Sequence, residues 1–399
     1  MLNTKLSPWP SFTQEEADKV SEVLLSNKVN YWTGQEGREF EKEFALFTNS
    51  KHAVAVANGT LALDLALVAL DVGQSNSGSL NDEVIVTSRT FLASASSIVT
   101  AGAKPVFADV DINTQNISAQ TIAAVLTKNT KAIVCVHLAG LPCEMDEIMA
   151  LANEYGIKVI EDCAQAHGAK YKGQSVGAIG DIGCWSFCQD KIMTTGGEGG
   201  MVTTNDESLW KKMWAYKDHG KSWDAIYQKE HPPGFRWLHE SFGTNWRMTE
   251  MQSAVGRIQL TRMPEWSKLR GNYAELIADT CSLFECIYVP MVPDYMEHAN
   301  YKCYAFVKPE LLADGWNRDR IVAEINALGV PCMQGSCSEV YLEKAFECTG
   351  FRPETRLANA KKLGETSLMF LVHPTLTNKE LKKTNSAIKI VLEQAQNLL

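Results

Sequence analysis

KAIVCVHLAGLPCEMDEIMALANEYGIKVIED (residues 131–162) holds two short apolar runs separated by a longer segment with helical periodicity. The runs KAIVCVHL (131–138) and IKVIED (157–162) are rich in Val and Ile, as is typical of strands buried on both faces of a parallel sheet. The segment between them, EMDEIMALANEYG (144–156), ends at Gly156, a common helix stop. The stretch therefore predicts a strand–helix–strand unit of an α/β domain.

The same alternation extends from about residue 50 to residue 205. Further helices are predicted over 60–70, 94–102 and 118–126. Strands alternating with helices of these lengths predict a three-layer α/β/α domain with a mainly parallel sheet. The remaining predicted strands are HAVAVAN (52–58), DEVIVTS (82–88), KPVFADV (104–110), CWSF (184–187) and GMVTTN (200–205).

A long segment, 217–248, has no clear periodicity, and such a segment usually builds or covers a functional site. A long helical pattern begins at residue 248 and leads into a second region with mixed signals. We interpret that region as a smaller α/β domain. Its predicted elements are a strand over 301–307, a helix over 318–329 and an amphipathic terminal helix over 379–396.

The expected domain division follows from these patterns. A large ligand-binding domain is predicted over residues 15–260, and a small C-terminal domain over 261–399. The N-terminal segment 1–14 is expected to join the small domain.

Composition excludes several classes of function. The 399 residues include 47 acidic and 38 basic side chains, for a net charge of −9. Nucleic acids are bound by clustered Lys and Arg, so we expect no nucleic-acid partner. The eleven cysteines form no Cys-x-x-Cys pair, which predicts reduced thiols and no metal site.

The N-terminus and the hydropathy pattern bear on location. MLNTKLSPWPSFTQEEADKV lacks the basic start and apolar run of a secretory signal. No stretch approaches the ~18 apolar residues of a membrane span. We therefore expect a cytoplasmic protein with no membrane partner.

One candidate anion site lies at Asn58-Gly59-Thr60, where a predicted strand ends and an apolar helix begins. Free N–H groups at a helix N-terminus attract anions, and glycine lets a phosphate approach the backbone. The alternative is a plain helix N-cap. No Walker P-loop or GxGxxG spacing occurs, so ATP and NAD are poor candidates.

Two further strand ends carry reactive groups. Asp162 ends IKVIED, and ligands of open α/β sheets bind at the carboxyl ends of strands; an N-cap is the alternative. Lys191 follows CWSF within SFCQDKIMTTGGEGGMV (186–202), where a desolvated amine can act as a nucleophile; an ordinary loop lysine is the alternative. A phosphate cradle, a carboxylate and an amine together match what pyridoxal 5′-phosphate requires.

These stretches resemble the DegT/DnrJ/EryC1/StrS family of sugar aminotransferases, which are fold-type-I pyridoxal phosphate enzymes. The resemblance implies an aspartate-aminotransferase-like fold and follows the family's order over most of residues 30–260. The matching stretches are ANGTLAL (57–63), DEVIVTSRTFLASA (82–95), VIEDCAQAHGAKYKG (159–173), IGDIGCWSF (179–187), Lys191 with GGEGG (196–200), and NWRMTEMQSAVGRIQL (245–260).

The resemblance implies roles for two reactive residues. Lys191 would bind the cofactor as a Schiff base and shuttle the proton between substrate and cofactor carbons. Asp162 would keep the pyridine nitrogen protonated, while its neighbour Glu161 faces the other side of the strand and is structural.

Further cofactor contacts are implied by the same resemblance. Gln165 would support the 3′-hydroxyl side, and Phe91 would stack on the ring unless it belongs to the core. Gly59, Thr60 and Ser186 would hold the phosphate, although Ser186 could merely be a small residue at a strand end. Asn245 would complete this grip from the partner subunit of a homodimer with shared active sites.

Substrate contacts are implied less directly. Tyr31, Trp32 and Gly34 lie in a family-like segment near the substrate, where aromatic rings could cover a sugar or base. Arg247 could bind a sugar diphosphate in bidentate fashion, or it could be a solvated arginine. His137 and His167 are expected to be packed in or near the sheet and not to be catalytic.

The chain departs from the family pattern in three places. The loop 73–82 is longer than usual and is expected to be exposed and mobile, and Arg89 stands beside Phe91 where another residue is usual. PCMQGSCSEVY (331–341) lacks the usual Tyr-x-Pro-x-His pattern. We expect this last segment to face the substrate.

The resulting hypothesis is a homodimeric aminotransferase. It would move an amino group from L-glutamate to a nucleotide-linked 4-keto-6-deoxy sugar in surface glycan biosynthesis, such as lipopolysaccharide O-antigen. One alternative is a pyridoxamine-phosphate-dependent sugar dehydratase, but such relatives carry histidine in place of Lys191. Another is a non-catalytic regulatory protein, which would need a DNA-binding segment that the sequence does not show.

Overall fold

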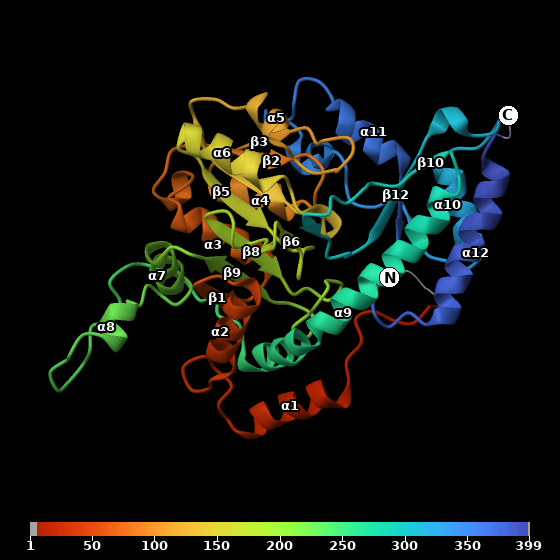
Figure 1. Cartoon of the computed structure of the whole chain (residues 1–399). Coiled ribbons are helices and arrows are strands. Elements are labelled where there is room, and N and C mark those ends of the chain that lie inside the picture. Colours follow the sequence, from red (N-terminus) through yellow and green to blue (C-terminus); the bar gives the residue numbers. More distant parts are fainter. Residues whose placement is uncertain (1–5, 398–399) are drawn as a thin grey trace.

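A seven-stranded, mainly parallel sheet forms the centre of the N-terminal two thirds of the chain in the computed structural model, which describes residues 6–397 (Figure 1). The strand order is β1-β9-β8-β5-β4-β2-β3, and only β9 runs antiparallel to its neighbours. All seven predicted strands are confirmed. They are β1 (His52–Val56), β2 (Glu83–Thr87), β3 (Lys104–Ala108), β4 (Thr130–Val136), β5 (Lys158–Asp162), β8 (Ile182–Ser186) and β9 (Gly200–Thr204).

Helices cover both faces of this sheet, as the nearly continuous apolar strands predict. Alternate residues of β1 enter different clusters: Val54 and Val56 pack with α3 (Gly59–Ala69) and α7 (Glu207–Tyr216), whereas Ala53 and Ala55 pack with α2 (Glu36–Thr48). The other helices of this region are α1 (Gln14–Leu25), α4 (Ala93–Thr100), α5 (Ala119–Ala123) and α6 (Met145–Tyr155). The layers are therefore α/β/α.

The helix predicted over 118–126 is shorter in the structure. Ser118 caps α5 by accepting the N–H of Thr121, but the helix ends at Ala123. The Val125 N–H then bonds to the carbonyl of Ile122, three residues back, so the chain tightens into a turn instead of continuing the α-helix.

The segment 217–248 is irregular apart from the short helix α8 (Trp223–Tyr227), and it extends away from the sheet (Figure 1). The loop 73–82 contains the short helix η1 (Gln74–Asn76). It is tied down by the Asp82 carboxylate, which accepts hydrogen bonds from the N–H groups of Gly73 and Ser79. Its tip is exposed, as predicted.

The second region contains a four-stranded antiparallel sheet of order β10-β12-β14-β13. The predicted strand over 301–307 and helices over 318–329 and 379–396 are confirmed as β12, α10 and α12. The elements are β10 (Ile287–Tyr288), β12 (Cys303–Val307), β13 (Cys332–Met333), β14 (Ser367–Phe370), α10 (Arg318–Ala327), α11 (Ala358–Thr366) and α12 (Asn378–Ala395).

One 33-residue helix, α9 (Glu250–Ser282), connects the two regions. It begins at the N-cap Thr249 and runs through the predicted domain boundary at residues 260–261. Leu260 and Met263 belong to a core cluster of the large sheet, whereas Ile277 belongs to the core of the small sheet. The proposed division into 15–260 and 261–399 would therefore cut through a continuous helix.

Two smaller features complete the fold. Leu6 packs with Leu376 and Leu381 of the C-terminal region. A small three-stranded sheet joins β11 (Met296–Glu297) to β6 (Lys170–Tyr171) and β7 (Gln174–Ser175). Among the described residues, none of the helices is both long enough and apolar enough to cross a membrane.

Candidate active site

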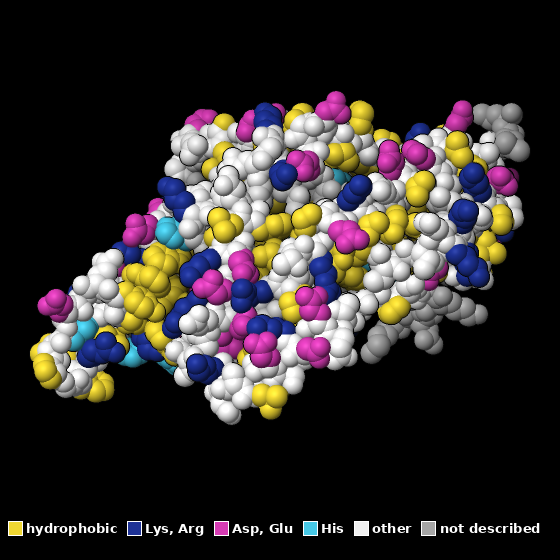
Figure 2. Space-filling view, turned by 60° about the horizontal axis from the view of Figure 1, so that its bottom comes forward, with side chains coloured by type: hydrophobic (Ala, Val, Ile, Leu, Met, Phe, Trp, Pro, Cys, Tyr) yellow, Lys and Arg dark blue, Asp and Glu magenta, His cyan; other side chains and the backbone are white. Residues whose placement is uncertain are grey.

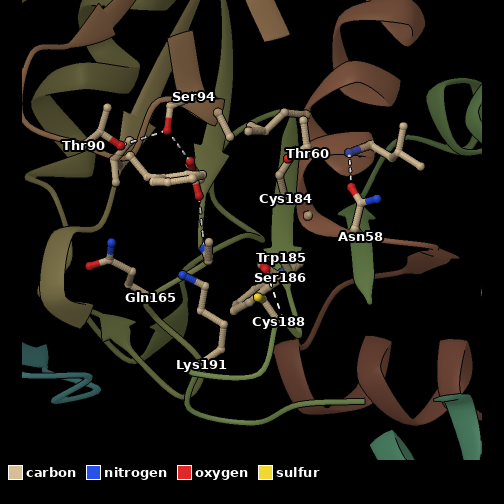
Figure 3. Close-up of a pocket in the computed structure, with 18 of the residues that line it drawn as sticks. Asn58, Thr60, Thr90, Ser94, Gln165, Cys184, Trp185, Ser186, Cys188 and Lys191 are labelled. Carbon is tan, nitrogen blue, oxygen red and sulfur yellow. Dashed lines mark hydrogen bonds between the residues drawn. The ribbon is translucent and has the colours of Figure 1, made fainter. Parts of the chain in front are cut away.

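A cavity of about 630 Å³ opens at the carboxyl ends of β5 and β8 (Figure 3). Seven of the predicted site residues line this cavity and come from five separate segments of the chain. They are Gly59, Thr60, Phe91, Asp162, Gln165, Ser186 and Lys191. We call this lining the sheet wall.

One end of the sheet wall has the shape of an anion cradle. Asn58 is the N-cap of α3, and its side chain accepts the N–H of Leu61 at 2.9 Å. The N–H groups of Gly59 and Thr60 have no acceptor within the helix, because the first turn of any helix leaves its donors free. A Cβ on Gly59 would lie 2.5 Å from Ser186 Cβ, so only glycine leaves this space open. The N-cap and anion-site interpretations of this motif are thus compatible.

Asp162 also lines the cavity and is 6% exposed. Its Oδ2 accepts the Ser94 hydroxyl at 2.7 Å, and its Oδ1 accepts the Ala164 N–H at 3.1 Å. Burial raises the pKa of the Asp162 carboxyl, while the Ser94 hydrogen bond and the charge of Lys191 act in the opposite direction. Thr90 in turn lies 2.8 Å from the Ser94 hydroxyl, so the carboxylate is held in one orientation.

Lys191 is close to Asp162 without being paired to it. Its side chain is 16% exposed, and Nζ lies 3.9 Å from Asp190 Oδ1. The backbone is fixed by the Trp9 indole, which donates to the Lys191 carbonyl at 2.8 Å. In Figure 3 the lysine side chain points into the cavity near Gln165. This placement argues against an ordinary loop lysine.

The two remaining cofactor candidates differ in how firmly they are held. Gln165 Oε1 accepts the N–H of Ala139 at 2.8 Å, which fixes its amide at the cavity wall. Phe91 is 69% exposed, so it is not a core residue. Its ring is available to a planar ligand.

A second cavity of about 480 Å³ continues from the first and shares Phe91, Gln165, Asp190 and Lys191 with it. We call its remaining lining the far wall. Met333, Gly335 and Ser336, from the segment 331–341, belong to the far wall; contact of this segment with substrate stays a prediction. The other members are Ser7, Trp9, Tyr301, Lys302, Tyr304, Met369, Leu371 and His373.

Sequence reasoning missed several residues of this site. Ser94 follows Thr90 by one helical turn, a spacing that the strand-end argument could have used. No sequence pattern marked Trp9 or Tyr301 as a site residue. Tyr301 lies in YKCYAFV (301–307), which indicates only a strand. The tertiary structure alone brings them to Lys191.

The predicted substrate residues do not line either cavity of their own chain. Tyr31 is buried and donates its hydroxyl to Glu41 at 2.9 Å, and the Trp32 indole donates to Asp218 at 2.7 Å. Arg247 forms an ion pair with the same Asp218 and is therefore not a solvated arginine. Within one chain these groups stabilise packing, and their contact with substrate stays a prediction.

Two other predicted positions also lie outside the cavities. Gly34 lies against Glu250, whose carboxylate fills the space that a Cβ would need. Asn245 is exposed, and its backbone bridges to Asp218. An exposed Asn245 outside its own cavity is compatible with a contact to a partner subunit.

His137 and His167 are both buried, as predicted. His137 bonds to Glu161 at 3.0 Å and accepts the Cys143 N–H, and Glu161 also accepts three backbone N–H groups. With Cys163 nearby, these side chains have the spacing of a possible metal site. The His137 nitrogens and the Glu161 oxygens are, however, already used in hydrogen bonds. Burial lowers the pKa of His167 to about 3, which keeps that ring neutral.

The site therefore fits pyridoxal 5′-phosphate on structural grounds. The Gly59–Ser186 cradle suits a phosphate, Asp162 suits a protonated ring nitrogen, and Lys191 suits a Schiff base. Each group lies on the wall of one cavity.

Comparison with known proteins agrees with this fit. Residues 10–389 match the model of the DegT/DnrJ/EryC1/StrS aminotransferase family. The chain is 38% identical over 328 residues to GDP-perosamine synthase of Caulobacter vibrioides, covering 80% of this chain and 81% of that protein. It is 38% identical over 270 residues to dTDP-3-amino-3,6-dideoxy-alpha-D-galactopyranose transaminase of Aneurinibacillus thermoaerophilus, covering 67% and 69%.

A solved structure is similar over nearly the whole chain. The X-ray structure of the aminotransferase from Psychrobacter cryohalolentis has a TM-score of 0.95 and 64% identity, and the match covers 98% of this chain and 100% of that one. The chain therefore belongs to the DegT/DnrJ/EryC1/StrS aminotransferase family and is an aminotransferase.

Proposed function

We propose that this protein uses pyridoxal 5′-phosphate to transfer an amino group from L-glutamate to a nucleotide-linked 4-keto-6-deoxy sugar. The observation that carries the proposal is the meeting of Lys191, Asp162 and the Gly59–Ser186 cradle on one cavity wall. The substrate class is supported by the two curated relatives, both of which are named for nucleotide-linked amino sugars.

Two residues of the sheet wall have defined tasks in this reaction. The cofactor, when bound, supplies an electron sink for charge that develops on the reacting carbon. Lys191 Nζ would move a proton between the substrate carbon and the cofactor carbon, away from the donor's α-carbon in the first half-reaction and onto the sugar carbon in the second. Asp162 meets the ring nitrogen, and a positive charge there would lower the pKa that burial raises in the free protein.

We further propose a homodimer in which Asn245 completes the phosphate grip of the partner. Residues 228–242, which we call the arm, extend from the body (Figure 1), and apolar side chains gather on and beside it in Figure 2. Phe235, Trp237 and Phe242 are 79% to 99% exposed. Exposed aromatic groups of this kind mark interaction surfaces, so a second subunit is the proposed cover.

The proposed setting is surface glycan biosynthesis in the cytoplasm, as the resemblance implies. Lys191 separates this proposal from the dehydratase alternative, in which histidine takes its place. The acidic net charge argues against a regulatory DNA-binding role.

Lys191→Ala tests the proposal directly. The purified variant should lack the visible absorbance band of lysine-bound cofactor and should show no measurable transfer from glutamate to nucleotide-linked keto sugars. Lys170→Ala, at a lysine that is 43% exposed and lines neither cavity, is the matched control and should behave as the wild type. A Lys191→Ala variant with full turnover would overturn the assignment.

A further inference from the structure

Three cationic side chains contact Tyr301: two lie over its ring and one bonds to its backbone carbonyl. Lys191 Nζ lies 5.4 Å from the ring centroid, and Lys302 Nζ lies 4.6 Å from it. Arg270 donates from Nη1 to the Tyr301 carbonyl at 3.4 Å. The ring and backbone of one residue therefore hold three positive groups together.

Arg270, on α9, is a buried charge without a counterion. It is 1% exposed, and its Nε and Nη2 atoms have no hydrogen-bond partner. Its guanidinium lies 5.0 Å from the centroid of the Trp9 ring, which separates it from the cavity. No ion pair of Arg270 occurs within residues 6–397, and burial lowers its pKa to about 9. An uncompensated buried charge is costly, so it calls for a function.

Of the two other cations, Lys302 lines the same cavity as Lys191, whereas Arg270 does not. Lys302 lines the far wall and is partly buried. Over the described part of the chain, no carboxylate pairs with its ammonium group. Burial, followed by the charge of Arg270, lowers the pKa of Lys302 to about 8, and the charge of Asp190 offsets this only in part.

Negative charge is scarce in this part of the cavity. Asp190 is the only carboxylate among the lining residues. It is already held by the Tyr301 hydroxyl, which donates to it at 2.6 Å, and by Lys191. His373, also on the far wall, stays neutral because burial lowers its pKa to about 3. The far wall thus carries an unbalanced positive charge.

We propose that Lys302 binds the carboxylate of the amino donor, and that Arg270 is a positioning residue that strengthens this site through its field. The inference rests on the proposed transfer from an amino acid. In an amino acid the α-carboxylate is bonded directly to the carbon that loses its proton. It must therefore lie near Lys191 Nζ, and Lys302 Nζ lies over the ring of the same tyrosine that Lys191 contacts.

The diphosphate of a nucleotide-linked sugar fits this position less well. It is attached to the sugar at the anomeric carbon and is separated from the ketone by the ring. An anion site that flanks the same tyrosine as Lys191 is thus better suited to a small carboxylate than to the diphosphate. Both sources of negative charge can be distinguished by experiment.

The test uses cofactor-loaded enzyme and glutarate, a dicarboxylate that cannot react because it has no amino group. Calorimetry should show that Lys302→Met weakens glutarate binding about tenfold, because a charged hydrogen bond contributes ~1.5 kcal/mol. Lys302→Arg should restore most of the affinity. Lys268→Met is the matched control, since Lys268 lines a separate cavity that Lys302 also borders, and it should leave binding unchanged.

Single-turnover absorbance measurements on the two half-reactions complete the test. The half-reaction with glutamate should need a higher concentration in Lys302→Met, whereas that with the keto sugar should not. Unchanged glutarate binding would overturn the inference, and so would a loss confined to the sugar half-reaction. Glutarate binding could depend on Lys302 even if the enzyme never accepts the amino group of glutamate. That result would support the carboxylate site and overturn the proposed function.

Discussion

The sheet wall and the far wall of the Lys191 cavity differ in how their polar groups are satisfied. On the sheet wall, Asp162 and Gln165 already have hydrogen-bond partners at 2.7–3.1 Å. Behind and along the far wall, Arg270 and Lys302 lack counterions within the described residues. The first arrangement orients groups in advance for chemistry. The second leaves charge unsatisfied until a ligand binds, which suits recognition.

Asp162→Asn should have the largest effect, because it removes the charge on the pre-oriented wall. We expect turnover to fall by about 100-fold or more, the scale seen when a single electrostatic contact to a reacting group is lost. The measurement is kcat with saturating donor. Ser94→Ala is the comparison variant and should lose less, since the Ala164 N–H still holds the carboxylate. Equal losses in both would mean that orientation matters more than charge.

Gly59→Ala should have a smaller effect, confined to cofactor affinity. The new Cβ would lie 2.5 Å from Ser186 Cβ, and overpacking of this kind costs about 1–3 kcal/mol. Cofactor affinity, measured by fluorescence titration of the free protein, should fall at least about tenfold. Gly271→Ala is the control, because its Cβ would meet nothing closer than 3.9 Å. Unaltered affinity in Gly59→Ala would show that the cradle does not hold the phosphate.

The smallest expected effect compares two fully buried arginines. Arg89 donates to Gln115, Ser338 and Ser367, whereas Arg270 has only one weak bond. Replacing an unpaired buried charge by an apolar side chain is neutral or stabilising, so Arg270→Met should raise the free energy of unfolding by about 1 kcal/mol. Arg89→Met should lower it by about 1–3 kcal/mol, because its acceptors lose their donors.

Urea unfolding of the cofactor-free protein measures both changes. A destabilised Arg270→Met would mean that Arg270 is retained for packing on Trp9 and not for ligand recognition. The contrast between the two arginines would then disappear.

The sequence predicted the architecture of the large sheet well. All seven strands lie on predicted apolar runs, several of them rich in Val and Ile, because burial on both faces favours continuous apolar residues. Strand-end position also marked Gly59, Asp162 and Lys191, since carboxyl ends of parallel strands meet at one edge. Ser186, Gln165 and Phe91 came only from the family resemblance. The helix over 118–126 was predicted too long, because local turn bonding ended it at Ala123.

What the sequence determined by itself was the sheet and the chemistry at its edge, because strand periodicity and strand-end position are local properties. Only the tertiary structure decided the far wall, where Trp9 and Lys302 come from segments that are distant in sequence, and the position of Arg270 over the Trp9 ring. Whether a charge is paired depends on which side chains surround it in space. No periodicity records that, so the unpaired cations beside Lys191 became visible only in the folded chain.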